Sequence, residues 1–261
     1  MASAISDLSR TTTGNDRFNA EAAAWDWQPF VHQASKGAAE AIIRILEQKY
    51  TTPEITSLDV LELGCGTGVL SFLLAPKVRQ IVAIDAAQGM IDVLRRKCEQ
   101  PELPKNILPL ALLLEDPEDT RLPPADCQHP GGERQRFDLV TSHLVLHHIP
   151  SLRPVLETLH GCLKKEGCVM LTDFEDFGPE AKRFHPASKM VGVARHGIDA
   201  DEIAGLMREV GFVDVDVRAH WSEEKIVERY EGEFGPEGGS KAKDAGEKMR
   251  FPFLVCHGVR R

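Results

Sequence analysis

Short apolar runs alternate with segments of helical periodicity along most of the chain. Five of these runs are almost entirely apolar, as in strands that are buried on both faces of a sheet. They occupy residues 58–63, 80–85, 107–114, 137–142 and 168–173. Between them, apolar residues recur three and four positions apart, which predicts amphipathic helices. This alternation predicts a parallel sheet that is covered by helices on both sides.

Three helices are predicted from their apolar faces, and a fourth, over 69–75, follows a glycine-rich turn. The apolar positions are Ala38, Ala41, Ile42, Ile45 and Leu46; then Met90, Val93, Leu94 and Cys98; then Leu152, Val155, Leu156 and Leu159. Ser151 stands where an N-cap is expected for the last of these helices.

The C-terminal third has a different pattern. Asp199 and Glu202 have the spacing of a capping box in front of a further apolar helix face, and Gly211 is the expected stop. Strict alternation over 212–217 predicts a strand, and 251–259 predicts a last one. Between these strands, the polar stretch 222–249 predicts either a loop insertion or a short charged helix with a mobile tail. A second Pro- and Gly-rich insertion covers 122–136.

Length and composition favour one folded domain. The chain has 261 residues, 42% of them hydrophobic, which is enough to bury a core. We expect a flexible N-terminus over 1–17 and a single domain over 18–261. Within this domain we expect lead-in helices at 18–50, a loop on the substrate side at 174–198 and a polar insertion at 222–249. The net charge of −9 argues against nucleic acid or an anionic membrane as the main partner.

The six cysteines and the N-terminal sequence indicate the cellular compartment in which the protein is expected. No two cysteines form a Cys-x-x-Cys pair, so neither a zinc knuckle nor a redox dithiol is indicated. The N-terminus does not resemble a signal peptide, and no apolar run approaches the length of about 20 residues that a membrane span needs. We therefore expect a cytoplasmic protein.

The most informative segment is the turn after the first strand, Glu62-Leu63-Gly64-Cys65-Gly66-Thr67-Gly68. Glycines between a strand and a helix let the backbone approach a ligand closely. Asp85 ends the next strand and is positioned to accept hydrogen bonds from ribose hydroxyls. A dinucleotide fingerprint would need a third glycine at Val69. A negative charge on Glu62 would repel a pyrophosphate and attract the sulfonium and ammonium groups of S-adenosylmethionine.

The turn and its flanking segments resemble class I S-adenosylmethionine-dependent methyltransferases. The closest likeness is to the small-molecule kind related to ubiquinone and menaquinone biosynthesis enzymes. The segments that carry the resemblance are 61–68, 81–85 with Met90, 137–149, 163–173 and 203–217, and 18–26 is similar to the lead-in helix of that group. The resemblance implies an α/β fold of the doubly wound, Rossmann-like type. Its seven-stranded sheet would be mostly parallel, with an antiparallel last strand.

The resemblance also implies roles for individual residues toward S-adenosyl-L-methionine as cofactor. The backbone at Gly64, Cys65 and Gly66 would lie along the methionine part, above Glu62. Other residues would contact the rest of the cofactor: Asp85 the ribose, Ala86 and Met90 the adenine ring, Glu115 or Asp116 the adenine amine, and Ser142 and His143 the methionine amino group through their carbonyls.

Three histidines, His143, His147 and His148, follow the fourth predicted strand. A metal site is conceivable because His143 and His147 are four positions apart. We expect none, since no nearby Asp, Glu or Cys completes it. We predict instead that His147 acts as a general base, because imidazole removes protons near neutral pH. Methyl transfer is an in-line displacement, so alignment alone can also suffice, without an obligatory base.

The leading hypothesis is a methyltransferase that acts on an O, N, S or C atom of a small molecule. Two alternatives stay open: an NAD(P)-dependent oxidoreductase, and a non-catalytic nucleoside-binding protein that acts through a protein partner. The segment 174–198 contains aromatic, Met and cationic residues that suit a pocket wall. Trp25 and Trp27 are expected to close the pocket from the other side.

Overall fold

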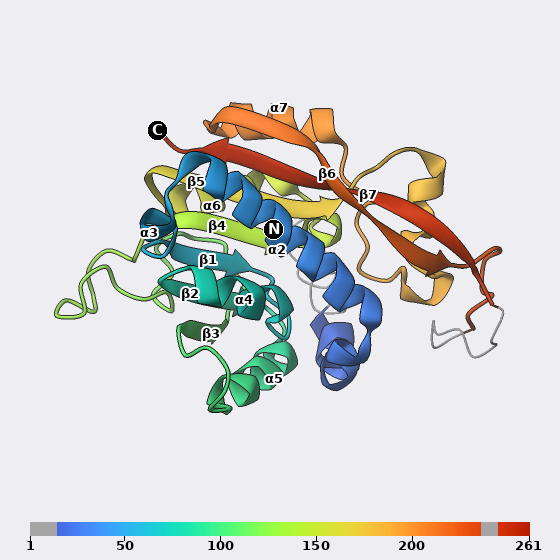
Figure 1. Cartoon of the computed structure of the whole chain (residues 1–261), viewed down its shortest axis with the longest axis horizontal. Helices are drawn as coiled ribbons and strands as arrows, with labels where there is room; N and C mark the ends of the chain where they lie inside the picture. Colours follow the sequence, from blue (N-terminus) through green and yellow to red (C-terminus); the bar gives the residue numbers. More distant parts are fainter. Residues whose placement is uncertain (1–14, 236–244) are drawn as a thin grey trace, which may run out of the picture.

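A seven-stranded sheet forms the centre of the protein, with the strand order β3-β2-β1-β4-β5-β7-β6 (Figure 1). The computed structural model describes residues 15–235 and 245–261, so most of the expected flexible N-terminus lies outside the described residues. The strands are β1 Asp59–Leu63, β2 Gln80–Asp85, β3 Ile107–Ala111, β4 Phe137–His143, β5 Leu163–Phe174, β6 Val213–Val227 and β7 Glu247–Val259. The first five pair in parallel, and β7 is antiparallel to both β5 and β6. The predicted fold class is confirmed.

Helices cover both faces of this sheet. The α-helices are α2 Pro29–Lys49, α3 Thr52–Ile55, α4 Val69–Leu74, α5 Gln88–Glu99, α6 Leu152–Cys162 and α7 Ala200–Val210. The 3-10 helices are η1 Ala22–Trp27, η2 Ala75–Lys77, η3 Leu146–His148, η4 Pro179–Phe184 and η5 Ala187–Lys189. Helices α2, α4 and α5 pack on one face, and α6 and α7 pack on the other. In the described parts of the chain, no helix is both long and apolar enough to cross a bilayer.

Successive residues of the central strands belong to different cores. On β1, Val60 packs with α2 and α4, whereas Leu61 packs with α6 and α7. The same division holds for Ile81 and Val82 on β2. Because both faces are buried, both residue sets must be apolar. This explains the nearly unbroken apolar runs of the sequence.

The prediction of a loop or helix over 222–249 is wrong at the two ends of that stretch, 222–227 and 247–249, which are strand, whereas 228–235 are turn residues as a loop would be. Strand β6 continues to Val227 and pairs with β7 from Ser222, opposite Pro252, to Val227, opposite Glu247. Exposed and partly buried residues alternate along this end of β6. Polar residues suit the exposed side of such a two-stranded ribbon, and its main-chain hydrogen bonds depend on a partner some 20 to 30 positions away. Residues 236–244, within the same stretch, lie outside the described residues.

Three local predictions have separate outcomes. The third strand ends at Ala111 rather than at 114. The Asp199 side chain accepts a hydrogen bond from the backbone of Glu202, which confirms the predicted cap of α7. Ser151 does precede α6, although its side chain makes no capping hydrogen bond.

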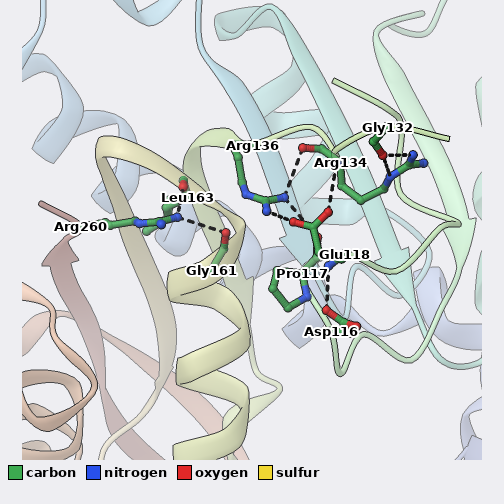
Figure 2. Close-up of polar contacts among 9 residues, drawn as sticks. All are labelled: Asp116, Pro117, Glu118, Gly132, Arg134, Arg136, Gly161, Leu163 and Arg260. Atoms are coloured by element: carbon green, nitrogen blue, oxygen red, sulfur yellow. Dashed lines mark hydrogen bonds and ion pairs between the residues drawn. The ribbon is translucent and has the colours of Figure 1, made fainter. Parts of the chain in front are cut away.

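The insertion 122–136 folds back on itself. The buried Arg134 guanidinium donates hydrogen bonds to the carbonyls of Leu122, Pro130 and Gly132, and so ties together the two ends of the loop. Figure 2 shows the contact with Gly132.

Candidate active site

The glycine turn has a left-handed backbone at three positions, with φ angles of 66° at Gly64, 54° at Gly66 and 83° at Gly68. A Cβ atom on Gly64 would lie 2.4 Å from Val145, so that position is filled by packing. At Gly66 the nearest atom would be Trp25 Nε1, at 3.8 Å. A Cβ atom would therefore fit at Gly66, so the backbone there is less crowded than at Gly64 on the side that faces Trp25.

Asp85 holds the turn against the end of β2. Its Oδ2 accepts a hydrogen bond from the Gly66 N–H and its Oδ1 accepts one from the Ala87 N–H, both at 2.8 Å. Burial raises the pKa of Asp85, and these two backbone donors oppose that rise. A carboxylate offers about four lone-pair sites, so two remain for further donors. Two ribose hydroxyls are donors of the right number and kind.

Glu62 lies beneath the turn and is only 2% exposed. It accepts a hydrogen bond from the Ser71 hydroxyl on α4. Burial raises the pKa of Glu62 to about 8, and the neighbouring Asp85 charge adds to this rise. In the protein alone, Glu62 is therefore mostly neutral near pH 7, in contrast to the charge assumed from the sequence. A cation nearby would favour the ionised form, because opposite charges stabilise each other in a buried site.

The N-terminal segment is fastened across this turn. Asp26 accepts hydrogen bonds from the Thr67 hydroxyl and, at 2.7 Å, from Lys97 Nζ. Asn19 accepts one at 2.7 Å from the Gly89 backbone on α5. Trp25 lies beside the turn, with its Nε1 3.8 Å from where a Cβ atom on Gly66 would be, and its closure of a pocket stays a prediction; Trp27 is 83% exposed, contrary to the same expectation. The segment therefore forms one wall of the site, and Asn19 and Asp26 are wall residues that the sequence reasoning missed.

Ala86 and Met90 lie near the same end of β2. Ala86 follows Asp85 directly and is half-buried. Met90 is 2% exposed and packs with Ala87 and with Ala22 of the N-terminal segment. Their position is compatible with the predicted contact to adenine, which stays a prediction.

Glu115 and Asp116 lie elsewhere. Asp116 accepts a hydrogen bond from the Glu118 backbone, and Glu118 pairs with Arg136, which immediately precedes β4 (Figure 2). This location is the amino end of β4, whereas the glycine turn is at the carboxyl ends of the strands. The Glu115 side chain is exposed, and its carbonyl accepts a hydrogen bond from Thr158 of α6. The structure brings neither carboxylate to the site, because the chain turns away from the carboxyl edge soon after Ala111.

The end of β4 presents buried polar atoms toward the glycine turn. Ser142 is fully buried, and its Oγ has no hydrogen-bond partner within the described ranges. Its carbonyl accepts a hydrogen bond from the Thr172 hydroxyl at 3.0 Å, and Thr172 accepts one in turn from His143 Nδ1 at 2.9 Å. Burial lowers the pKa of His143 to about 4, so its ring is neutral. Unpartnered buried polar atoms are rare, and here they fit a polar ligand.

His147 forms a buried pair with Asp173, the last residue but one of β5. The His147 Nδ1 lies 2.8 Å from Asp173 Oδ1, and the backbone N–H groups of His147 and Phe174 also donate to this carboxylate. The carboxylate therefore selects the tautomer with hydrogen on Nδ1, and the lone pair is on Nε2. That Nε2 is buried and has no partner in the described chain. Asp173 ends a strand as Asp85 does, and this signal went unused in the sequence.

Two further imidazoles lie beside His147. His148 Nδ1 is 2.8 Å from the Gly192 carbonyl, and the His147 and His148 ring centroids are 3.9 Å apart. The segment 174–198 returns over this edge and places His185 with its ring centroid 5.0 Å from that of His147. Burial lowers the pKa of both His148 and His185. No acid stands near these histidines in the sequence, which spoke against a metal site, but the structure places Asp173 beside His147.

Comparison with known proteins identifies the family of this chain. A family model described as "Methyltransferase domain" matches residues 30–217, which include the glycine turn, Asp85 and the whole histidine cluster. The chain belongs to this family. The sequence-based prediction of an S-adenosylmethionine-dependent methyltransferase is thereby confirmed.

Similar proteins carry the same description. An uncharacterised methyltransferase of Schizosaccharomyces pombe is 31% identical over 224 residues, 78% of this chain and 73% of the relative. A ubiquinone biosynthesis O-methyltransferase of Coxiella burnetii is 28% identical over 54% of this chain, and the match spans only about half, 53%, of the relative. The crystal structure of a putative methyltransferase from Bacillus halodurans shares the fold. Its TM-score is 0.58 at 17% identity, over 78% of this chain and 93% of that one.

Proposed function

We propose that this methyltransferase transfers the methyl group of S-adenosylmethionine to an oxygen atom of a small-molecule acceptor. The observation that carries the proposal is the pair of polar clusters at the carboxyl edge of the sheet. The glycine turn with Asp85 suits the nucleoside, and the Asp173–His147 pair suits an acceptor proton. The sequence left N, S and C acceptors open. An oxygen acceptor is favoured because the similar Coxiella burnetii protein is named an O-methyltransferase, and the unpartnered His147 Nε2 suits the removal of a hydroxyl proton.

The proposed cofactor site consists of Glu62, the backbone of 64–66, Asp85, Ala86, Met90 and Ser142. Asp85 accepts from the two ribose hydroxyls through the lone pairs that Gly66 and Ala87 leave free. The cationic part of the cofactor stabilises the ionised form of Glu62. Trp25 Nε1 lies 3.8 Å from where a Cβ atom on Gly66 would be, so this ring borders the proposed site.

When bound, S-adenosylmethionine supplies a methyl carbon that the acceptor oxygen attacks, while sulfur keeps the electron pair of the broken C–S bond. His147 Nε2 accepts the proton of the acceptor hydroxyl as this bond forms. Asp173 keeps the imidazole in the correct tautomer and stabilises the charge that it gains. The stacked rings of Phe174 and Phe184, 3.9 Å apart, lie beside His147 and keep water from its surroundings.

The test is product analysis with S-adenosylmethionine that carries an isotopically labelled methyl group. The protein is incubated with this cofactor and a metabolite extract, and mass spectrometry searches for labelled products. We expect a labelled methyl ether or ester. His147→Gln should lower kcat by about 100-fold or more, the scale of general base catalysis, and leave the Kd of S-adenosylhomocysteine unchanged.

His129→Gln is the matched control, because that imidazole is 77% exposed and pairs with Asp126 in the insertion 122–136. It should leave activity unchanged. Labelled products that are exclusively N-, S- or C-methylated would refute the oxygen acceptor. Binding of S-adenosylhomocysteine without any methyl transfer would favour a non-catalytic protein, and the family match gives no support to an oxidoreductase.

A further inference from the structure

We propose that His147, His148 and His185 bind a divalent transition-metal ion of the Zn²⁺ class, with Asp173 as the carboxylate that orients the first ligand. One potential ligand atom from each imidazole lies within 4.8 Å of the others. The residues come from η3 and from the loop after η4, so only the tertiary structure assembles them.

The hydrogen bonds of His147 and His148 are of the kind that metal ligands make. A ligating histidine usually donates its second N–H to a carboxylate or a backbone carbonyl. His147 Nδ1 contacts Asp173 and His148 Nδ1 contacts the Gly192 carbonyl, so both rings present Nε2 to the cluster. Over the residues described, His147 Nε2 and His185 Nδ1 are buried without any hydrogen-bond partner. An ion would satisfy such nitrogens.

The distances between the three ligand nitrogens need only a local adjustment to fit one ion. Zn–N bonds of about 2.0–2.1 Å in tetrahedral geometry bring the nitrogens to roughly 3.4 Å from one another. His185 follows η4 in a loop and lies outside the sheet, so its ring can move toward His147 with little cost to the core. His147 itself is fixed by Asp173 and stays in place.

Three imidazoles leave one position of a tetrahedral ion open. Arg17 and Lys225 lie close enough to His185 to oppose positive charge there, so the ion needs an anionic fourth ligand to offset them. The effect of the ion on methyl transfer, though not its binding, rests on the proposed function. An acceptor hydroxyl bound to the ion would release its proton to water, since bound oxygen is more acidic. His147 would then be a ligand and not the general base, because one nitrogen cannot both bind an ion and accept a proton, so Co²⁺ binding at this site would replace the base role proposed above for His147.

The experiment uses the full chain without a histidine tag, treated with a chelator and then titrated with Co²⁺. We expect one Co²⁺ per chain, the visible absorption of four-coordinate Co²⁺, and loss of this absorption when Zn²⁺ is added. His185→Gln and His148→Gln should abolish the absorption, and Asp173→Asn should weaken Co²⁺ binding by about 10–100-fold. His129→Gln, an exposed histidine of the insertion, is the control and should bind as the wild type does.

The thermal unfolding midpoint of every variant shows whether it is folded, and His185→Gln is decisive because His185 lies in a loop. A folded wild-type chain that gives no absorption with Co²⁺ refutes the site, as does absorption that survives in folded His185→Gln. Binding of S-adenosylhomocysteine is measured on the same samples. If the chain binds S-adenosylhomocysteine but not Co²⁺, the metal site alone is overturned. If it binds Co²⁺ but not S-adenosylhomocysteine, the metal site is supported and the proposed cofactor site is overturned.

Discussion

Replacing Asp85 by asparagine tests the link between the glycine turn and the cofactor. Each carboxylate oxygen of Asp85 already accepts one backbone N–H at 2.8 Å, from Gly66 or from Ala87. Asparagine has nearly the same shape but only one acceptor oxygen. Its NH₂ group would face one of these two N–H donors and could not accept from a ribose hydroxyl.

The expected loss of cofactor affinity follows from the number of hydrogen bonds that disappear. At least one hydrogen bond between a ribose hydroxyl and a charged acceptor disappears, and such bonds contribute about 1.5–3 kcal/mol. Because 1.4 kcal/mol corresponds to about tenfold in affinity, the Kd of S-adenosylhomocysteine should rise by about 10–100-fold. A smaller loss of unfolding free energy should accompany it, since one backbone donor of the turn is left facing a donor.

Isothermal titration with S-adenosylhomocysteine measures the effect. The matched control is Asp92→Asn on α5, because the Asp92 side chain is 49% exposed and, among the described residues, bonds only to its own helix neighbours Gln88 and Arg95. Its Kd should equal that of the wild type. The reasoning is refuted if Asp85→Asn keeps its unfolding midpoint and still binds as tightly as the wild type.

Three further variants probe stability and the wall of the site. The contribution of Glu62 to the unfolding free energy should fall as pH rises from about 5 to about 8, because Glu62 keeps its proton longer in the folded state, whereas buried histidines such as His143 contribute in the opposite direction; urea unfolding of the wild type and of Glu62→Gln isolates this contribution as the difference between them, and a difference that does not change with pH would contradict the assigned burial. Gly64→Ala should lose about 2–4 kcal/mol of unfolding free energy, from left-handed strain and the clash with Val145, and a loss below the error of the measurement would speak against this turn geometry. Asp26→Asn should speed dissociation of S-adenosylhomocysteine in stopped-flow measurements by about tenfold, because the charged pair with Lys97 is lost; an unchanged rate would mean that the N-terminal segment does not retain the ligand.

The sequence predicted a strand well where the burial of that strand can be read from its own residues. Strand β2 was predicted with its observed bounds, because a strand buried on both faces must be apolar throughout. The strands over 212–217 and 251–259 were predicted, but their extensions, β6 from 218 to 227 and β7 from 247 to 250, were missed, because exposed charged residues are common to loops and to strands with one solvated face. Only the pairing of β6 with β7 identifies residues 222–227 as a strand.

For the site, the sequence by itself determined the glycine turn and Asp85. These residues belong to one strand–turn–helix unit and the strand beside it, so short-range geometry fixes their relation. Only the tertiary structure decided that Asp173 and His185 join His147, and that Asp116 lies at the opposite edge of the sheet. Strand order and the return of a loop over the sheet bring these residues together or apart. Both arise from the packing of distant segments, which no local pattern of residues records.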